Sequence, residues 1–314
     1  MIRFEGVTKR FPGADRPAVD ALDLVVAEAT TCALIGPSGC GKSTTLRMVN
    51  RLIEPDTGRI RIGERDIASV DPVTLRRGIG YVLQGVGLFP HRSVAQNVAT
   101  VPALLGWPRA RIAARVEAML DLVGLEPDRF GDRRPDALSG GQRQRVGVAR
   151  ALAADPDVIL MDEPFGAVDP VARDRLQSEI GAILKRLRKT VILVTHDIGE
   201  AMRMGDQIAL MRDGRLVQAG SPDHLLAAPA DAFTAHFLGE TRALRRLERL
   251  QARDFAQAPA AGEAAPAIPE EASLQEALDR MLETGTDRVT VGDRSLTLEA
   301  VRAAARAAPG EGGD

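Results

Sequence analysis

The sequence predicts an α/β fold whose core is a mainly parallel β-sheet, and three apolar runs carry that prediction. The runs span 32–35, 158–161 and 190–195, and each leads into polar or glycine-rich sequence. Continuous apolar runs of this length are typical of strands that are buried on both faces by covering helices. Ligands of open parallel sheets collect beyond the carboxyl ends of the strands. We therefore expect the residues that follow these runs to lie together along one edge of the sheet.

The first run leads into a glycine-rich turn and then into a helix predicted over 42–53, whose apolar residues Leu46, Val49 and Ile53 recur at helical spacing. Backbone N–H groups of such a turn can point at phosphate oxygens, and the helix dipole favours negative charge there. Lys42 would reach the β- and γ-phosphates of a nucleotide, and the Ser43 hydroxyl would bind Mg²⁺. The alternative is a glycine-rich turn without a ligand.

The second run ends in two acids, Asp162 and Glu163. At the carboxyl end of a strand, Asp162 would lie near the phosphate loop, where a carboxylate can bind Mg²⁺. Glu163 would face the γ-phosphate and could orient an attacking water or accept its proton. The alternative is a pair of solvated acids that begins a turn.

Two further strand ends carry side chains that suit the same chemistry. The third run ends in His196, and Gln84 follows a strand predicted over 79–83. A glutamine side chain both donates and accepts hydrogen bonds, which suits a residue that contacts Mg²⁺ and the attacking water. An isolated histidine at a strand end would be a structural residue, but the repetition of polar strand ends favours a shared phosphate site.

A second phosphate cradle is predicted much further along the chain. Ser139 is placed as an N-cap, and Gly140 and Gly141 open a helix that continues through Leu152. The N-terminus of that helix can receive an anion. One triphosphate needs only one cradle, so a second, distant one indicates a nucleotide held between two surfaces. The alternative is a capped helix start with no ligand.

Taken in order, these motifs resemble those of the ATPase subunits of ABC transporters. The matching segments are GPSGCGKS at 36–43, the strand end at Gln84, LSGGQRQRVGVARAL at 138–152, VILMDEP at 158–164, GAVD at 166–169 and TH at 195–196. The likeness covers residues 1 to about 240. It implies a P-loop NTPase cassette with a mainly parallel sheet core, an antiparallel β subdomain and an inserted helical subdomain.

The resemblance also implies roles for individual residues. Phe11 would stack on adenine, Gln84 would be the Q-loop glutamine and Asp169 would lie in the D-loop. Glu163 would be the catalytic base and His196 the switch histidine on the γ-phosphate. The nucleotide would be held by Gly36, Pro37, Ser38, Gly39, Cys40, Gly41, Lys42, Ser43, Thr44, Ser139, Gly140, Gly141 and Gln142, and Mg²⁺ by Ser43, Gln84 and Asp162.

Two positions depart from the family pattern. Val168 replaces the more usual leucine before Asp169, and Gly199 stands where an aspartate is common after the switch motif. Both lie off the reacting atoms, so we expect them to tune activity and not to abolish it.

Composition fits an ATPase that works with separate membrane subunits. The chain has 314 residues, of which 45% are hydrophobic, enough for two domains with a core. Its net charge of −2 gives no reason to expect nucleic acid as a partner. The two cysteines indicate no disulfide framework, and no run approaches the roughly 18 to 20 apolar residues that cross a bilayer. No secretory signal is seen, so we expect a reducing cytoplasmic setting.

The resemblance implies ATP and Mg²⁺ as cofactors and, with one cassette in the chain, a head-to-tail homodimer with two ATP at its interface. Integral membrane permease subunits and a separate solute-binding protein are the other expected partners, at the cytoplasmic face of the cell membrane. The block from Leu75 to Trp107 is similar to that of quaternary-amine osmoprotectant importers, the glycine betaine, choline and carnitine group. Two alternatives stay open: an importer of another polar solute such as an amino acid, and a soluble ABC ATPase that acts as a mechanical clamp.

Beyond the predicted ATPase domain at 1–240, the composition changes. Residues 241–253 indicate an amphipathic helix with several arginines, which suits a solvated face or contact with anionic lipid. An alanine- and proline-rich stretch then predicts a linker, so that 241–272 joins the cassette to the last segment. Residues 273–314 are expected to form a small α/β extension that resembles a single, partial CBS-type motif. It either pairs across the homodimer or is a degenerate remnant.

Overall fold

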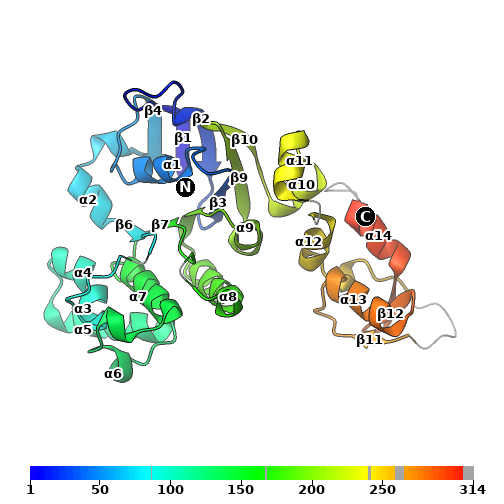
Figure 1. Cartoon of the computed structure of the whole chain (residues 1–314). Coiled ribbons are helices and arrows are strands. Elements are labelled where there is room, and N and C mark those ends of the chain that lie inside the picture. The colour runs from blue at the N-terminus through cyan, green and yellow to red at the C-terminus, as the bar shows by residue number, and fades with distance from the viewer. Residues whose placement is uncertain (86, 167, 240–241, 259–264, 307–314) are drawn as a thin grey trace. The chain divides into compact units, whose positions relative to one another are not determined.

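A six-stranded sheet forms the centre of the fold (Figure 1), in a computed structural model that describes residues 1–85, 87–166, 168–239, 242–258 and 265–306. Strand β3 pairs in parallel with β8 and β9, and β7 pairs in parallel with β6 and β8. The order of strands is β10-β9-β3-β8-β7-β6. This confirms the expected parallel core. The strands are β3 (Thr31–Ile35), β6 (Ile79–Val82), β7 (Val158–Asp162), β8 (Thr190–Val194), β9 (Gln207–Arg212) and β10 (Arg215–Gly220).

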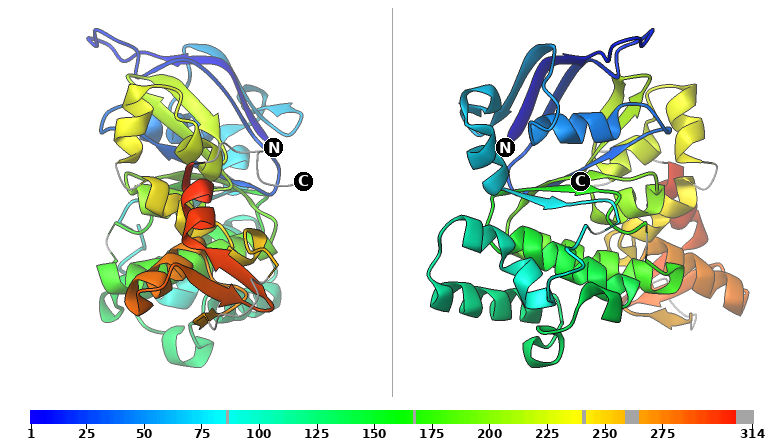
Figure 2. Two further views of the ribbon diagram at one scale, coloured as in Figure 1. Left: turned by 90° about the vertical axis from the view of Figure 1, so that its right-hand side faces the viewer. Right: turned by 60° about the vertical axis from the view of Figure 1, so that its left-hand side comes forward.

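The two faces of this sheet pack into different hydrophobic clusters. Strands β3, β7 and β8 are buried along their full length, which explains their continuous apolar sequences. Side chains alternate between faces along a strand, so Leu160 joins one cluster with Leu46 of α1, while Ile159 joins the other with Val146 of α7. Figure 2 shows α1 and α7 on opposite sides of the sheet. The helices named here are α1 (Lys42–Val49) and α7 (Gly140–Leu152).

Helix α1 is shorter than the sequence predicted. It ends at Val49 with Asn50 as its C-cap, and Arg51 adopts a left-handed φ of 48°, so the predicted continuation to residue 53 is wrong. The carbonyls of Asn50 and Arg51 instead accept hydrogen bonds from the Arg76 guanidinium. The end of α1 is closed locally, because the Arg51 N–H donates to Met48 O at 3.0 Å and the Leu52 N–H donates to Arg47 O at 2.9 Å.

An antiparallel four-stranded sheet covers the α1 side of the core. Its strand order is β2-β1-β4-β5, and all three pairings are antiparallel, as the β subdomain of the resembled family implies. Burial alternates along β2, as expected for a sheet with one solvated face. The strands are β1 (Ile2–Lys9), β2 (Val19–Val26), β4 (Thr57–Ile62) and β5 (Arg65–Asp66).

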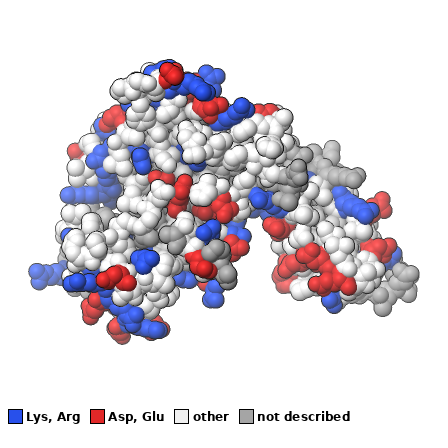
Figure 3. All heavy atoms as spheres, viewed as in Figure 1, with Lys and Arg blue, Asp and Glu red and all other residues white. Residues whose placement is uncertain are grey.

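Helices inserted between β6 and β7 form a helical layer that shares the hydrophobic cluster on the α7 face of the sheet, drawn in cyan to green in Figure 1. The Arg150 guanidinium on α7 donates to the Gly87 carbonyl at 2.7 Å, which ties this layer to the loop that follows β6. Lys and Arg side chains are interspersed with Asp and Glu over the face of residues 1–219 seen in Figure 3. The helices between β6 and β7, besides α7, are α3 (Val94–Val98), α4 (Thr100–Leu104), α5 (Arg109–Leu122), α6 (Pro127–Phe130) and the 3-10 turn η2 (Pro135–Ala137). The other helices of residues 1–219 are α2 (Pro72–Arg77), α8 (Pro170–Arg186), α9 (Ile198–Met204) and the 3-10 turn η1 (Ile67–Ser69).

Contacts divide the chain into two units, Met1–Ala219 and Gly220–Asp314, so the C-terminal unit begins earlier than the boundary that the sequence suggested. This unit has its own hydrophobic cluster around a three-stranded sheet in the order β11-β12-β13. Its elements are α10 (Pro222–Ala227), α11 (Ala232–Leu238), α12 (Arg242–Arg249), η3 (Ala252–Asp254), β11 (Ala267–Ile268), α13 (Leu274–Thr284), β12 (Arg288–Val291), β13 (Arg294–Thr297) and α14 (Leu298–Arg306).

The segment expected to be a linker takes part in this C-terminal core. Ala256 is 8% exposed and belongs to the cluster, and Gln257 pairs with Ser295. Helix α12 packs Leu247 into this cluster, as expected for an amphipathic helix, but Leu244, which was expected on the same side, is exposed. Residues 259–264 of the predicted linker and 307–314 of the predicted extension lie outside the described residues.

Candidate functional site

The sheet brings four predicted strand ends to one edge. Strands β3, β8, β7 and β6 are neighbours, so their carboxyl ends lie side by side. The residues there are Gly36 after β3, His196 after β8, Asp162 at the end of β7 and Gln84 after β6. The parallel register therefore gathers side chains that lie far apart in the sequence.

The phosphate loop between β3 and α1 is shaped around Lys42. This lysine is 7% exposed, and its Nζ donates to the carbonyls of Gly36 at 2.7 Å and Pro37 at 2.9 Å. Gly36 and Gly41 adopt φ of +143° and +106°, and a Cβ would lie 2.1 Å and 2.2 Å from backbone carbonyl oxygens. Only glycine fits these two positions. The loop thus closes around an ammonium group at the start of a helix, where anions are favoured.

A cavity of about 290 Å³ lies against this loop. Its lining combines the loop with the ends of β7 and β8, since Glu163 and His196 both contribute. The sequence prediction omitted Ala18, which also lines it and precedes β2. The remaining lining residues are Ser38, Gly39, Gly41, Lys42, Ser43 and Thr44.

Glu163 lies between the other two polar strand ends. Its Oε2 accepts a hydrogen bond from Gln84 Nε2 at 3.1 Å and lies 3.4 Å from His196 Nδ1. Glu163 adopts a left-handed φ of 45°, which is uncommon for a residue with a Cβ, and its N–H donates to Val194 O at 2.9 Å. The carboxylate is thus fixed between an amide donor and an imidazole, an arrangement that suits orientation and deprotonation of a water.

Asp162 and Ser43 meet at the same edge. Ser43 Oγ donates to Asp162 Oδ1 at 3.1 Å. Burial raises the pKa of Asp162, and the hydrogen bond from Ser43 opposes that shift. A hydroxyl and a carboxylate in contact are hard oxygen donors that fit Mg²⁺, which takes one or two carboxylates and completes its shell with phosphates and water. In the part of the chain that the structure describes, no three His, Cys, Asp or Glu residues cluster as a dedicated metal cage.

The Ser139 loop forms a second, separate cavity of about 520 Å³. Ser139 is the N-cap of α7, as the sequence predicted, and it exchanges hydrogen bonds with Gln142 in a capping box. Ser139, Gly141, Gln142 and Asp169 line this cavity together with Arg145, Ala172, Arg175 and Leu176, which the sequence prediction missed. No residue lines both this cavity and the phosphate-loop cavity.

Three other residues named in the sequence analysis, Phe11, Cys40 and Val168, line neither cavity. Phe11 is 39% exposed in the loop after β1, with Lys9 Nζ 5.8 Å from its ring centre, and it lines neither cavity. Cys40 is buried in the phosphate loop, and burial raises the pKa of its thiol. Val168, one of the two departures, is 5% exposed and packs into the core beside α8. Ala167 lies outside the described residues.

The sequence analysis missed Glu200 and the contact that Thr195 of the TH motif makes with it. Thr195 precedes His196, and its hydroxyl donates to the buried Glu200 carboxyl on α9 at 3.1 Å. The spacing of Asp197 and Glu200 matches a capping box, a signal that predicts a helix start and a solvent-side glutamate. Only one of the two hydrogen bonds of a capping box is formed: Asp197 Oδ1 accepts from the Glu200 N–H. The Glu200 side chain accepts from the Thr195 hydroxyl instead of from the Asp197 N–H.

The fold and the site together define a P-loop ATPase cassette, and comparisons with known proteins agree. Residues 19–166 match the family described as ABC transporter. The osmoprotectant import ATP-binding protein OsmV of Salmonella typhimurium is 48% identical, over 93% of this chain and 76% of OsmV. The glycine betaine/carnitine/choline transport ATP-binding protein OpuCA of Bacillus subtilis is 43% identical, over 95% of this chain and 77% of OpuCA. YehX of Escherichia coli, a glycine betaine uptake system ATP-binding protein, is 48% identical over 93% of this chain and 94% of YehX.

Among solved structures, the dimeric ATP-binding cassette MJ0796 bound to ADP and Pi superposes with a TM-score of 0.63. It is 32% identical, and the match covers 70% of this chain and 98% of that one. The chain belongs to the ABC transporter family, as an ATP-binding protein of the class whose ATPase activity drives transport. Within the described residues, no helix is both long and apolar enough to span a membrane.

Proposed function

We propose that this chain hydrolyses ATP to power import of a quaternary-amine osmoprotectant such as glycine betaine, choline or carnitine. The observation that most supports ATP hydrolysis is the position of the Glu163 carboxylate, which contacts Gln84 and His196 beside the phosphate-loop cavity. The solute class is supported by OsmV, OpuCA and YehX, whose names state osmoprotectant, glycine betaine, carnitine or choline transport.

In this mechanism, a water attacks the γ-phosphorus, the bond to the ADP oxygen breaks, and Glu163 accepts the proton that the water loses. Gln84 and His196 orient the water and the γ-phosphate through side chains that already contact Glu163. Lys42 Nζ exchanges its carbonyl contacts for the β- and γ-phosphate oxygens. Phe11 stacks on adenine, and the loop residues 36–44 hold the phosphates.

Ser43, Asp162 and Gln84 would hold Mg²⁺. Their oxygen atoms suit this ion, and the Ser43 to Asp162 contact places two of the three side chains together. When bound, Mg²⁺ would neutralise charge on the β- and γ-phosphates. Because Asp162 is nearly fully buried, at 4% exposed, it would be aimed at the ion and not at bulk solvent.

We further propose a head-to-tail homodimer with two ATP at its interface. The two cavities share no lining residue, which supports a role for the Ser139 loop and Asp169 outside the chain's own phosphate site. The N-terminus of α7 would complete the site of the partner subunit. The dimeric state of MJ0796 supports this arrangement.

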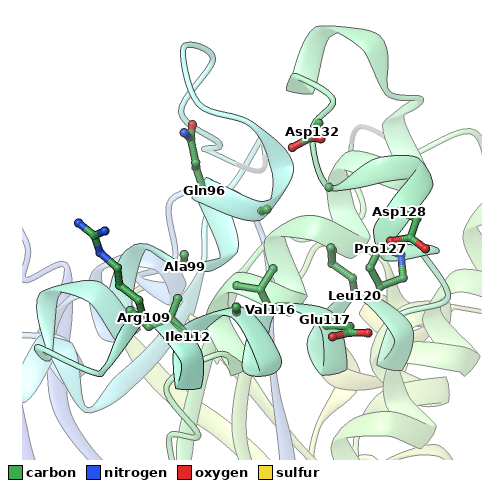
Figure 4. Close-up of a pocket in the computed structure, with 13 residues that line it drawn as sticks. Gln96, Ala99, Arg109, Ile112, Val116, Glu117, Leu120, Pro127, Asp128 and Asp132 are labelled. Carbon is green, nitrogen blue, oxygen red and sulfur yellow. The ribbon is translucent and has the colours of Figure 1, made fainter.

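Permease subunits would dock in a groove of the helical layer, close to the loop after Gln84. The groove encloses about 590 Å³ between α3, α5 and α6. Figure 4 shows Ile112, Val116 and Leu120 along α5, facing the segments that carry Gln96 and Asp132. An apolar strip with polar edges suits an amphipathic helix. This docking would place the ATPase at the cytoplasmic face of the cell membrane, where a separate solute-binding protein delivers the solute from the other side.

The C-terminal segment is assigned as a partial CBS-like unit. The order β11, α13, β12, β13, α14, with β11 and β12 parallel and β12 and β13 antiparallel, supports that assignment. With one such unit in the chain, either it pairs across the homodimer or it is a remnant. The ATPase domain at 1–240 carries all the proposed chemistry.

The decisive experiment is purification of the chain with its native membrane subunits, followed by solute uptake into proteoliposomes. Glycine betaine, choline and carnitine should each be tested against an amino acid, with ATPase activity measured in parallel. Stimulation by a quaternary amine supports the proposal, and stimulation by the amino acid alone overturns the solute class. Copurification of no integral membrane protein would favour a soluble clamp. Ala113→Arg, at an exposed position in the lining of this groove, should remove the permease while the isolated chain keeps its ATPase activity.

A further inference from the structure

Glu200 is a buried acid that the proposed hydrolysis does not use. Its side chain is 4% exposed, and its Oε2 accepts hydrogen bonds from Thr195 Oγ1 at 3.1 Å and Gln177 Nε2 at 3.5 Å. Among the described residues, its Oε1 has no hydrogen-bond partner although it is buried. Burying an acid in this way costs free energy, so its position calls for a compensating role.

The contacts of Glu200 clamp the turn that carries His196. The Thr195 hydroxyl donates to Glu200 and accepts from the Asp197 N–H at 3.0 Å. Asp197 Oδ1 in turn accepts from the Glu200 N–H at 3.1 Å. The residues on both sides of His196 are therefore bonded to Glu200, while the His196 side chain is 69% exposed and extends toward Glu163.

Helix α8 holds the same cluster from the other side. Gln177 is fully buried, donates to Glu200 and accepts from the Arg203 guanidinium. The Arg173 guanidinium lies 4.0 Å from Asp197 Oδ2 and also donates to Val168 O at 3.0 Å. The turn is thus fixed against two helices and the loop that contains Asp169.

We propose that Glu200 is a positioning residue, which acts through Thr195 to hold the 195–197 turn so that His196 faces Glu163. Glu200 lines neither cavity, so it does not act on the nucleotide directly. The inference rests on the proposed function, because it presupposes that His196 serves hydrolysis. Its effect should appear in turnover and not in nucleotide affinity.

The protonation state of Glu200 makes the proposal testable with an isosteric variant. Burial raises the pKa of Glu200 to about 8, and the nearby Asp197 and Glu163 carboxylates add to the shift. The Thr195 hydrogen bond and the Arg173 charge oppose it. The side chain is therefore mainly neutral at pH 7, and a glutamine can accept the same two hydrogen bonds.

Steady-state ATPase kinetics and ATP binding should be measured on the full-length Glu200→Ala and Glu200→Gln chains. Misplacement of a catalytic group by about 1 Å costs up to about 100-fold in rate, so Glu200→Ala should lower kcat by about 10- to 100-fold. KM for ATP should change by less than about threefold, because an interaction used only in the transition state is lost. Glu200→Gln should recover turnover to within about threefold of the wild type.

Met204→Ala is the matched control. Met204 lies on the same helix as Glu200 and packs α9 into the hydrophobic core, but its side chain takes no part in the hydrogen bonds that hold the 195–197 turn. It should lower Tm by an amount comparable to Glu200→Ala while keeping kcat. Equal losses of kcat in both variants, or a Glu200→Gln chain as slow as Glu200→Ala, would overturn the proposal.

Thr195→Val keeps the test open if Glu200→Ala does not fold, because it removes only the hydroxyl. It should reduce kcat as Glu200→Ala does, and the double variant should lose no more than either single one. Additive losses would contradict a shared path to His196. If Glu163→Gln loses turnover while Glu200→Ala and Thr195→Val do not, the positioning role fails and the proposed ATPase site stands. If Glu163→Gln keeps turnover, the proposed site itself fails.

Discussion

Replacing Glu163 by glutamine removes one proton acceptor and changes little else in the site. The glutamine keeps the length of the side chain, and its Oε1 can still accept the hydrogen bond that Gln84 Nε2 now donates at 3.1 Å. The Glu163 backbone is held by its N–H, which donates to Val194 O at 2.9 Å, and this hydrogen bond does not involve the carboxylate. The variant is therefore expected to fold and to keep the cavity against the phosphate loop.

Loss of a general base lowers turnover by about 100- to 10,000-fold, which is about 3 to 5 kcal/mol of activation free energy. ATP affinity should stay the same or rise, because the negative charge that faces the phosphates is gone. Phosphate release measures the first quantity and equilibrium binding of a fluorescent ATP analogue measures the second. ATP-bound dimers should accumulate in size-exclusion chromatography.

Lys42→Ala is the contrasting control for this experiment. It removes a charged donor that the loop holds at its centre, and a hydrogen bond to a charged group contributes about 1.5 to 3 kcal/mol. ATP binding should therefore weaken by about 10- to 150-fold. Phosphate release by Glu163→Gln within about threefold of the wild type would refute the assignment of Glu163 as the base.

Three further predictions test the loop, the dimer and the buried acid. Gly36→Ala should lower Tm strongly, because its Cβ would lie 2.1 Å from a carbonyl oxygen; Gly63→Ala, at φ +58° in open space, should cost much less, and equal losses would contradict the steric argument. Ser38→Cys combined with Ser139→Cys should crosslink two chains when ATP is present in the Glu163→Gln background, since both native cysteines are buried; no crosslink would count against the head-to-tail dimer. Because the pKa of Glu200 is raised, the folded state binds the proton more tightly than the unfolded state does. The free energy of unfolding should therefore fall as pH rises between about 4.5 and about 8, by at most about 1.4 kcal/mol per pH unit. Urea unfolding of Glu200→Gln at several pH values should show no such slope.

Sequence reasoning succeeded where local chemistry dictates structure. The apolar runs predicted strands β3, β7 and β8 within one residue at each end, because strands buried on both faces tolerate few polar residues. The Ser139 N-cap was predicted from a serine placed directly before the helix start, and it is confirmed because the Ser139 side chain accepts from the Gln142 N–H. Both features depend on neighbours in the chain, which a sequence displays directly.

It failed where contacts with distant segments accompany a change in the backbone. Helix α1 ends at Val49 and Arg51 adopts a left-handed φ of 48°, where Arg76 binds the carbonyls of Asn50 and Arg51, and nothing in residues 42–53 indicates that contact. The alanine- and proline-rich stretch appeared to be a spacer, yet Ala256 is buried and Gln257 pairs with Ser295. Composition alone does not show whether a segment packs against the rest of the protein.

The sequence by itself determined the chemistry of this protein: a phosphate loop with Lys42, acids at the end of a buried strand, and a second loop at Ser139. Motif spacing along one chain suffices for this, because each motif is a local turn between a strand and a helix. Only the tertiary structure decided which of these groups meet. The parallel order of β3, β8, β7 and β6 brings Glu163 between Gln84 and His196, and packing of α8 against α9 buries Glu200 beneath the His196 turn. These contacts join residues far apart in the chain, and sheet order and helix packing set them.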